Sequence, residues 1–253
     1  MSETDTILRT EGLTKDFRGF VAVKGVSLSV RRGTIHALIG PNGAGKTTCF
    51  NLLTKFLVPS GGTITYNGRD ITRARPADIA RLGMVRSLQI SSVFPNLTAL
   101  ENVRVALQAK LHGRSFDFWR SGSVLERLHP KALELLGKVG LESLAAVPAG
   151  ELSYGRKRAL EIATTLALEP ELILLDEPTA GMGHEDVERI ATLIKTVAAG
   201  RTVLMVEHNL SIVSSLSDHI TVLARGEILA EGSYAKVSAD PKVREAYMGS
   251  SDV

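Results

Sequence analysis

Short apolar runs alternate with helical patterns along most of the chain, and this alternation is typical of an α/β protein. The run at 171–177 has a continuous apolar stretch at its centre, which predicts a strand buried on both faces. Asn67 and Gly68 tolerate positive φ and predict a tight hairpin turn. The same reasoning predicts strands at 25–30, 34–40, 84–87 and 201–208, a hairpin over 63–71, and a second hairpin over 219–232 that turns near Gly226.

The middle of the chain, from about residue 91 to residue 167, has a helical pattern instead. Thr98 and Glu101 form a T-x-x-E capping box, which predicts a helix start. Pro130 suits the first turn of a second helix over 130–141, and a third helix begins near Tyr154. We therefore expect one domain over residues 1–253, in which a helical subdomain at 91–167 interrupts an α/β core formed by 1–90 and 168–253.

Composition places the chain among ordinary globular proteins. It has 253 residues, of which 44% are hydrophobic and 23% charged, enough for a sizeable core. The net charge of +3 is too small to indicate a nucleic-acid partner. Cys49 is the only cysteine, so no intrachain disulfide is expected, and we interpret it as a small buried residue. The opening segment lacks the pattern of a signal peptide, and no apolar run approaches the ~20 residues of a membrane span.

The segment GPNGAGKTT at 40–48 matches the phosphate-loop pattern G-x-x-x-x-G-K-[ST], between a predicted strand and a predicted helix. Its glycines let backbone N–H groups turn toward phosphate oxygens, and the helix N-terminus adds the positive end of its dipole. We expect Lys46 to reach the β- and γ-phosphates of a nucleotide, and Thr47 to offer a hydroxyl to Mg²⁺. A chance match would be a plain Gly-rich turn, which the flanking elements disfavour. The nucleotide-binding residues predicted here are Gly40, Pro41, Asn42, Gly43, Ala44, Gly45, Lys46, Thr47 and Thr48.

Two acids end the apolar run at 171–177. Asp176 is placed to reach a magnesium ion, directly or through water, from a strand next to the phosphate loop. Glu177 follows, and its carboxylate can accept a proton from the attacking water or orient that water. Alone, the pair would be interpreted as solvated acids at a strand end. Beside a complete phosphate loop, it predicts a site of nucleotide hydrolysis.

Three further residues are candidates for the same site, each with a plain structural alternative. Gln89 follows the strand at 84–87, where its amide can act toward the Mg²⁺ site or its water, although a surface glutamine would look the same. His208 ends the strand at 201–208, where an imidazole can hydrogen-bond a γ-phosphate oxygen or merely cap the next element. Phe17 can stack on adenine, with core packing as the alternative.

The segment LSYGR at 152–156 opens the third helix. Ser153 suits a helix cap, Gly155 opens the backbone, and the basic residues 156–158 follow at once. A helix start with an open backbone and a cationic flank is suited to an anion such as a phosphate.

In their order and spacing, these motifs resemble the ATPase subunit of ABC transporters over almost the whole chain. The residues that carry the resemblance are Phe17, the Walker A loop 40–48, Gln89, the signature 152–156, the Walker B strand 172–176, Glu177 and His208. The resemblance implies a P-loop NTPase core with a mostly parallel sheet, an N-terminal antiparallel β subdomain and an inserted α-helical subdomain.

The same resemblance implies Mg²⁺-dependent hydrolysis of ATP. Lys46 would hold the phosphates, Glu177 would act as general base, and His208 and Gln89 would align water and phosphate. Mg²⁺ would be held by Thr47, Gln89 and Asp176. In this family two ATPase subunits pack head to tail, so Ser153 and Gly155 of one subunit would contact the γ-phosphate that the other carries.

Within the family, the chain resembles the ATPases of branched-chain amino-acid importers. Tyr154 replaces a glycine of the common signature LSGGQ, and a tyrosine there is familiar in these importers. The segments 40–72 and 223–249 also resemble them, and no regulatory domain is expected after Gly232. Arg156 replaces the usual glutamine, and Gly183 stands where the family often has an acid or asparagine. The contact of Arg156 with nucleotide is expected to differ from that of the usual glutamine. The contact across subunits at Gly183 is expected to be weaker or to be made by His184 instead.

Other functions remain open at this point. ATPases of urea or amide importers and of lipopolysaccharide exporters share much of the pattern. A soluble ABC ATPase that acts on ribosomes or DNA is a further class, which a single Walker A motif and the lack of a heptad run disfavour. A degenerate module without turnover is disfavoured by the intact Glu177 and His208.

The resemblance also implies partners and a location. The partners are a second ATPase subunit, identical or a sister, transmembrane permease subunits and, indirectly, a solute-binding protein, at the cytoplasmic face of the inner membrane. The permease is expected to insert a short helix beside Phe94 and Leu97. Phe116, Phe118 and Trp119 are interpreted as packing on their own subdomain, with an interface as the alternative. The solute is not encoded here, because selectivity belongs to the permease and the receptor.

Overall fold

The computed structural model describes residues 5–87, 93–111 and 126–248. The chain divides into two compact units. Unit 1 comprises residues 1–84, 171–178 and 198–253, and unit 2 comprises residues 85–170 and 179–197.

The larger sheet is mainly parallel and has the strand order β11-β10-β4-β9-β8-β7. Strands β4, β8 and β9 are buried at every position, which explains their continuous apolar runs. β10 pairs parallel to β4, whereas β11 returns antiparallel as the predicted hairpin. The bounds are β4 Ile35–Ile39, β7 Met84–Ser87, β8 Leu172–Asp176, β9 Thr202–Val206, β10 His219–Ala224 and β11 Glu227–Gly232.

A second, antiparallel sheet in unit 1 has the order β2-β1-β5-β6, with β3 also paired to β1. Its strands are β1 (Thr6–Phe17), β2 (Phe20–Gly25), β3 (Ser29–Arg31), β5 (Gly61–Tyr66) and β6 (Arg69–Asp70). The predicted hairpin over 63–71 is confirmed, with positive φ at Asn67 and Gly68. The prediction of one strand over 25–30 is wrong. Gly25 has a φ of 61°, which ends β2, and a regular strand resumes only at Ser29.

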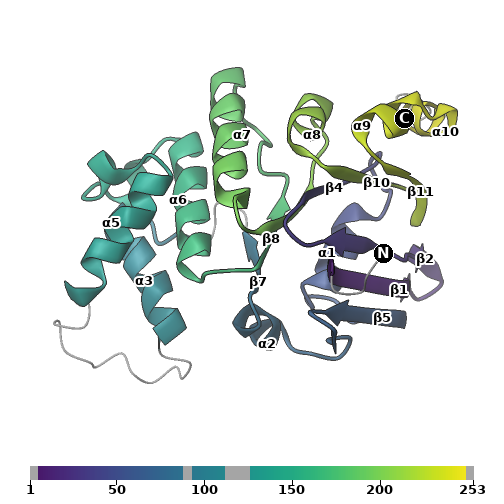
Figure 1. The fold of residues 1–253 in the computed structure, drawn as a ribbon, viewed down its shortest axis with the longest axis horizontal. Helices are drawn as coiled ribbons and strands as arrows, with labels where there is room; N and C mark the ends of the chain where they lie inside the picture. The colour runs from purple at the N-terminus through teal and green to yellow at the C-terminus, as the bar shows by residue number, and fades with distance from the viewer. Residues whose placement is uncertain (1–4, 88–92, 112–125, 249–253) are drawn as a thin grey trace. The chain divides into compact units, whose positions relative to one another are not determined.

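Helix α1 (Lys46–Leu53) packs between the two sheets (Figure 1). Its Phe50 and Leu53 belong to the same buried cluster as Leu8 of β1 and Leu204 of β9. The interpretation of Cys49 as a buried residue of this helix is confirmed, and burial raises the pKa of its thiol to about 12. The remaining helices of unit 1 are α2 (Pro76–Arg81), α8 (Leu210–Leu216), α9 (Tyr234–Ala239) and α10 (Pro241–Met248).

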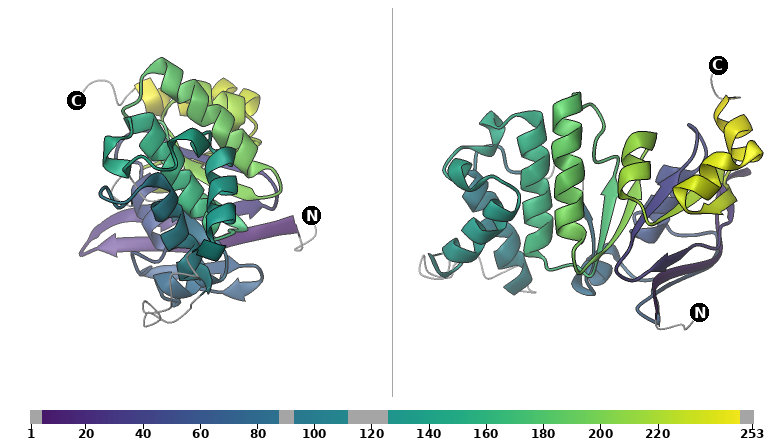
Figure 2. Two further views of the ribbon diagram at one scale, coloured as in Figure 1. Left: turned by 90° about the vertical axis from the view of Figure 1, so that its left-hand side faces the viewer. Right: turned by 45° about the horizontal axis from the view of Figure 1, so that its top comes forward.

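Unit 2 is helical. It contains α3 (Ala99–Leu111), α5 (His129–Lys138), α6 (Tyr154–Ala167) and α7 (His184–Ala198), with 3₁₀ turns at Glu142–Leu144 and Ala149–Glu151. Helices α3, α5 and α6 contact one another, and α7 runs beside α6 in both Figure 1 and Figure 2. Within the described ranges, none of the helices combines the length and apolar character that a membrane crossing requires.

The start of α3 confirms the predicted capping box. The backbone N–H of Thr98 donates to Oε2 of Glu101 over 2.8 Å, and the N–H of Glu101 donates to Oγ1 of Thr98 over 3.2 Å. The bond from the Thr98 N–H, together with a 2.9 Å bond that the Thr98 hydroxyl donates to the same Oε2, lowers the pKa of Glu101. The predicted starts of the other two helices are also confirmed, with Pro130 in the first turn of α5 and Tyr154 opening α6.

Candidate functional site

The loop at 40–48 joins β4 to α1, and its path depends on two close backbone approaches. A Cβ atom at Gly40 would lie 2.1 Å from the carbonyl oxygen of Leu223, and one at Gly45 would lie 2.5 Å from that of Ala22. At Gly43 there is open space, but the φ of 75° favours glycine. The loop therefore forms a cradle that side chains at Gly40 and Gly45 would displace.

The N-terminus of α1 fits a phosphate. Gly45 is its N-cap, and within the part of the chain that the structure describes this cap makes no side-chain hydrogen bond to the first N–H groups of the helix. The buried Nζ of Lys46 donates to the carbonyl oxygens of Gly40 and Pro41, over 2.7 and 2.9 Å. Burial lowers the pKa of Lys46, while the charge of Glu177 raises it. The loop thus holds an ammonium group beside uncapped backbone donors, which is the donor set that a polyphosphate needs.

The other residues predicted in this loop lie around that cradle. Ala44 is buried, and its carbonyl oxygen accepts a 3.0 Å hydrogen bond from the N–H of Gly226, which ties the loop to the β10–β11 hairpin. Asn42 and Thr47 are exposed, and Thr48 is half-buried.

The acids and the histidine meet at the carboxyl ends of two neighbouring parallel strands. Asp176 is the last residue of β8, is buried, and lies opposite Val206 of β9 in the register. The N–H of Glu177 donates to the carbonyl oxygen of Val206 over 2.9 Å. Nδ1 of His208 lies 4.0 Å from Oε1 of Glu177.

Glu177 has a φ of 45°, in the left-handed region that non-glycine residues rarely occupy. Such a conformation costs roughly 1–3 kcal/mol and persists where the surrounding structure imposes it. The backbone bond to Val206 is part of that constraint, and it directs the Glu177 side chain toward His208. Backbone strain thus coincides with the residue that sequence reasoning assigned as the base.

Two supporting residues were missed by the sequence analysis. Glu207 is fully buried, and its Oε2 accepts from the N–H groups of His208 and Asn209, over 2.9 and 3.0 Å. It fixes the backbone that carries His208, and an acid directly before this histidine was the available signal. Tyr247 of α10 is the other residue. Burial raises its pKa to about 12, and a hydrogen bond with the backbone of Gly40 acts in the opposite direction.

Phe17 lies where β1 turns into β2, paired in register with Phe20. Its relative exposure is 43%, so the alternative of core packing is wrong. The Nζ of Lys15 lies 5.2 Å from the centroid of the Phe17 ring. The ring is therefore a partly open surface, as stacking on a base would require.

In unit 2, Ser153 occupies the N-cap position of α6, but the expected side-chain cap bond is not made. Gly155 is buried, and a Cβ atom there would lie 2.7 Å from Oδ1 of Asp186 in α7. The hydroxyl of Tyr154 donates to the carbonyl oxygen of Ala180 over 3.0 Å. Gln89, Phe116, Phe118 and Trp119 lie outside the described residues.

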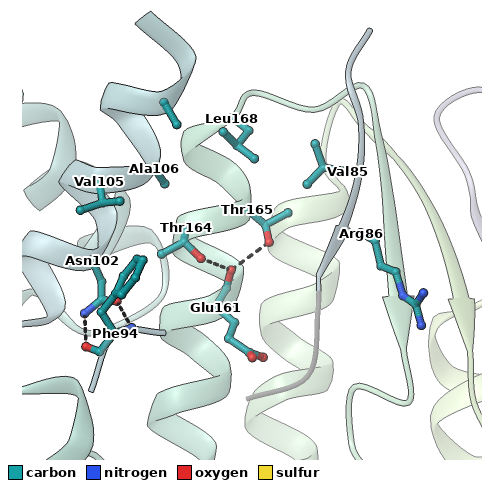
Figure 3. Close-up of a pocket in the computed structure, with 11 residues that line it drawn as sticks. Val85, Arg86, Phe94, Asn102, Val105, Ala106, Glu161, Thr164, Thr165 and Leu168 are labelled. Carbon is teal, nitrogen blue, oxygen red and sulfur yellow. Dashed lines mark hydrogen bonds between the residues drawn. The ribbon is translucent and has the colours of Figure 1, made fainter. Parts of the chain in front are cut away.

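Unit 2 also contains a groove of about 230 Å³ (Figure 3). It is apolar in the main, and Phe94 on its wall is 53% exposed. Asn102 fixes the adjacent turn, because its Nδ2 donates to the carbonyl oxygens of Phe94, Leu97 and Thr98. The groove is lined by Val85, Arg86, Phe94, Asn102, Val105, Ala106, Ala109, Glu161, Thr164, Thr165 and Leu168.

A phosphate cradle, a buried lysine and acids at the carboxyl ends of parallel strands together define a P-loop nucleotide-binding protein. The family model for the ABC transporter matches residues 23–180, and that for the branched-chain amino acid ATP-binding cassette transporter matches residues 227–253. The chain belongs to the ABC transporter family, as an ATPase cassette.

Individual proteins agree with that assignment. The high-affinity branched-chain amino acid transport ATP-binding protein BraF of Pseudomonas aeruginosa is 39% identical, with 96% of this chain and 98% of BraF covered. The ADP conformation of an ATP-binding cassette of an ABC transporter has a TM-score of 0.83 at 34% identity, covering 96% of this chain and 99% of that one. A dimeric cassette in a post-hydrolysis state, bound to ADP and phosphate, has a TM-score of 0.76 at 27% identity, covering 90% and 99%.

Proposed function

We propose that this protein is the ATP-hydrolysing subunit of an importer of branched-chain amino acids. The single observation that supports hydrolysis most strongly is the approach of His208 to Glu177 in the same unit as the phosphate loop. The solute is supported by the family match at residues 227–253 and by the name of BraF.

The phosphate loop and the ends of strands β8 and β9 would supply different groups for hydrolysis. Lys46 and the uncapped N–H groups of α1 bind the phosphates. Among the described residues, no group of three His, Cys, Asp or Glu side chains could hold a metal ion. Thr47 and Asp176 would therefore share Mg²⁺ with nucleotide oxygens, and with Gln89, and the ion would neutralise charge on the phosphates.

Glu177 would take a proton from the attacking water as the water oxygen bonds to the γ-phosphorus. The bond from that phosphorus to the bridging oxygen breaks, and its electron pair leaves with ADP. His208 would donate a hydrogen bond to a γ-phosphate oxygen from beside Glu177, and Glu207 holds the backbone of His208 for that contact. Phe17, which is partly exposed, would stack its ring on the adenine.

We further propose that the working form contains two ATPase subunits and a permease. The dimeric post-hydrolysis cassette supports pairing, in which Ser153 and Gly155 of one subunit would face the nucleotide of the other. The groove beside Phe94 is the site where a short permease helix would dock, and Leu97 is not among the residues that line it. The subunit would then lie on the cytoplasmic face of the membrane without crossing it.

The test is transport by the assembled complex. The complex would be purified from native membranes, its companion subunits identified by mass, and the complex placed in vesicles with ATP. We expect ATP-dependent uptake of labelled leucine, and no uptake in a complex that carries Lys46→Met. Uptake of urea or an amide in place of leucine, or extraction of lipopolysaccharide, would overturn the assignment of the solute. Phosphate release that persists in the Lys46→Met complex would overturn the assignment of the site.

A further inference from the structure

Tyr154 fastens the signature segment to the loop that follows Glu177. Its hydroxyl donates a 3.0 Å hydrogen bond to the carbonyl oxygen of Ala180. The same hydroxyl lies beside Gly181, where a Cβ atom would be 3.7 Å away. Gly181 has a φ of 74°, so the loop turns at the point of contact. A glycine at position 154, as in the common signature, could not make this bond.

A second contact joins the same two segments. The backbone of Gly155 lies against the Asp186 carboxylate in the first turn of α7, and a Cβ atom at Gly155 would make that carboxylate shift. Adjacent residues at the start of α6 therefore hold both ends of the segment 180–186. Since all of these residues belong to unit 2, the signature segment and this loop form one body.

The loop is also joined covalently to the proposed general base. Glu177, Pro178 and Thr179 lead directly into Ala180. A displacement of the start of α6 would therefore act on Glu177, whose backbone has a positive φ and is held by its hydrogen bond to Val206. A chain of so few residues leaves little slack to absorb such a displacement.

We propose that Tyr154 is a positioning residue that couples the two nucleotide sites of the assembled transporter. This inference rests on the proposed function, in which the signature segment contacts the nucleotide of the partner subunit. Occupancy of the partner's site sets the position of α6, and the bond from Tyr154 to Ala180 passes that position to Glu177 of its own subunit. The hydroxyl of Tyr154, rather than its ring, carries the coupling. A tyrosine that only packed on the loop would not depend on its hydroxyl.

Tyr154→Phe tests the inference, because it keeps the ring and removes only the donor. Tyr234→Phe, at the first turn of α9 in unit 1, is the matched control. Both would be studied as the full chain in the complex, first by hydrogen exchange of the amides at 179–183 without nucleotide. A lost neutral hydrogen bond changes an equilibrium by roughly 2- to 10-fold, so exchange in Tyr154→Phe should accelerate by about that factor.

The second measurement is the steady-state rate of ATP hydrolysis by the same complexes. We expect kcat of Tyr154→Phe to fall by roughly 2- to 10-fold and the KM for ATP to stay close to that of the parent protein, because the phosphate loop is untouched. If Tyr154→Phe has the amide exchange rate or the kcat of the parent protein, the inference is overturned. A change in Tyr154→Phe that is confined to the KM for ATP would also overturn it. An inactive parent complex would instead overturn the proposed function, and the exchange reading would still decide whether the bond holds the loop.

Discussion

Nδ1 of His208 and Oε1 of Glu177 are 4.0 Å apart, at the carboxyl ends of adjacent parallel strands. The separation is too long for a direct hydrogen bond and leaves each group able to bind a shared ligand. Both side chains are also partly open to solvent, at 58% and 39% exposure. We expect the two side chains to contact the attacking water and the phosphate from the same side, and this expectation gives the first prediction.

Glu177→Gln should bind nucleotide as tightly as the parent protein and lose turnover. The amide keeps the size and the hydrogen bonds of the carboxylate but cannot accept the proton, and a general base contributes roughly 10²- to 10⁴-fold. Phosphate release and nucleotide affinity would be measured on the same preparation. Glu188→Gln is the matched control, since Glu188 lies beside His184 in a largely exposed pair of the same residue types. Full activity in Glu177→Gln would refute the assigned role.

Gly40→Ala and Gly43→Ala should lower the free energy of unfolding by different amounts. The Gly40→Ala side chain meets the backbone oxygen of Leu223 at 2.1 Å, so the main chain has to move, whereas Gly43→Ala enters open space. Gly43→Ala should therefore lose only the ~1–2 kcal/mol of a left-handed L-residue. Gly40→Ala should lose that and a further ~1–3 kcal/mol for overpacking. Denaturant unfolding would measure both, and equal losses would contradict the close approach.

Gly155→Ala should destabilise the fold through Asp186, since the new methyl group would lie 2.7 Å from Oδ1. Because the obstacle is the end of an Asp side chain that is 35% exposed and can rotate away, a loss of only ~0.5–1.5 kcal/mol is expected. The double variant Gly155→Ala/Asp186→Ala removes the obstacle and should recover most of it, compared with Asp186→Ala alone. Thermal unfolding of the four proteins forms the cycle. Additive losses would mean that Gly155 is required for another reason, such as close approach of the partner's nucleotide.

Stability should fall with pH below about 6.5, the pKa of an unfolded histidine, because of His36. Nε2 of His36 is hydrogen-bonded to Oγ1 of Thr221 over 2.9 Å, and its ring packs against that of His219. Burial, and then the charges of His219 and Arg31, lower the pKa of His36 to about 3. Between these values the unfolded chain binds a proton that the folded chain does not, so unfolding becomes easier as pH falls, by up to ~1.4 kcal/mol per pH unit.

The corresponding measurement is the free energy of unfolding from pH 7 to pH 4 for the parent protein and for His36→Asn. The variant should have the shallower slope, because its amide does not titrate. His129→Asn, at an exposed position in α5, is the control that should keep the parent slope. Parallel curves for the parent protein and His36→Asn would contradict the assignment.

Features that depend on neighbouring positions in the chain could be predicted from the sequence. The buried strands β4, β8 and β9, the turn at Asn67-Gly68 and the capping box of Thr98 with Glu101 are of this kind. Strand β1 was not predicted, because register irregularities interrupt its pairing and with it the alternation that identifies a strand. The single strand expected over 25–30 ignored the positive φ that Gly25 adopts.

The same distinction between local and distant contacts applies to the functional site. The phosphate loop, Asp176, Glu177 and His208 lie within short motifs, and the structure brings the last two together. Contacts between distant segments could not be inferred. The bond from Tyr154 to Ala180 and the approach of Tyr247 to Gly40 join residues far apart in the chain, and only the fold makes them neighbours.

The central claim is that one chain supplies only part of each hydrolytic site. It is tested most directly by the rate of phosphate release per chain, measured for the isolated protein in dilute solution, with its mass of 27.2 kDa verified, and for the same chain within the transporter complex. The account predicts hydrolysis by the complex and almost none by the isolated chain. An isolated chain that releases phosphate as fast as the complex would contradict it.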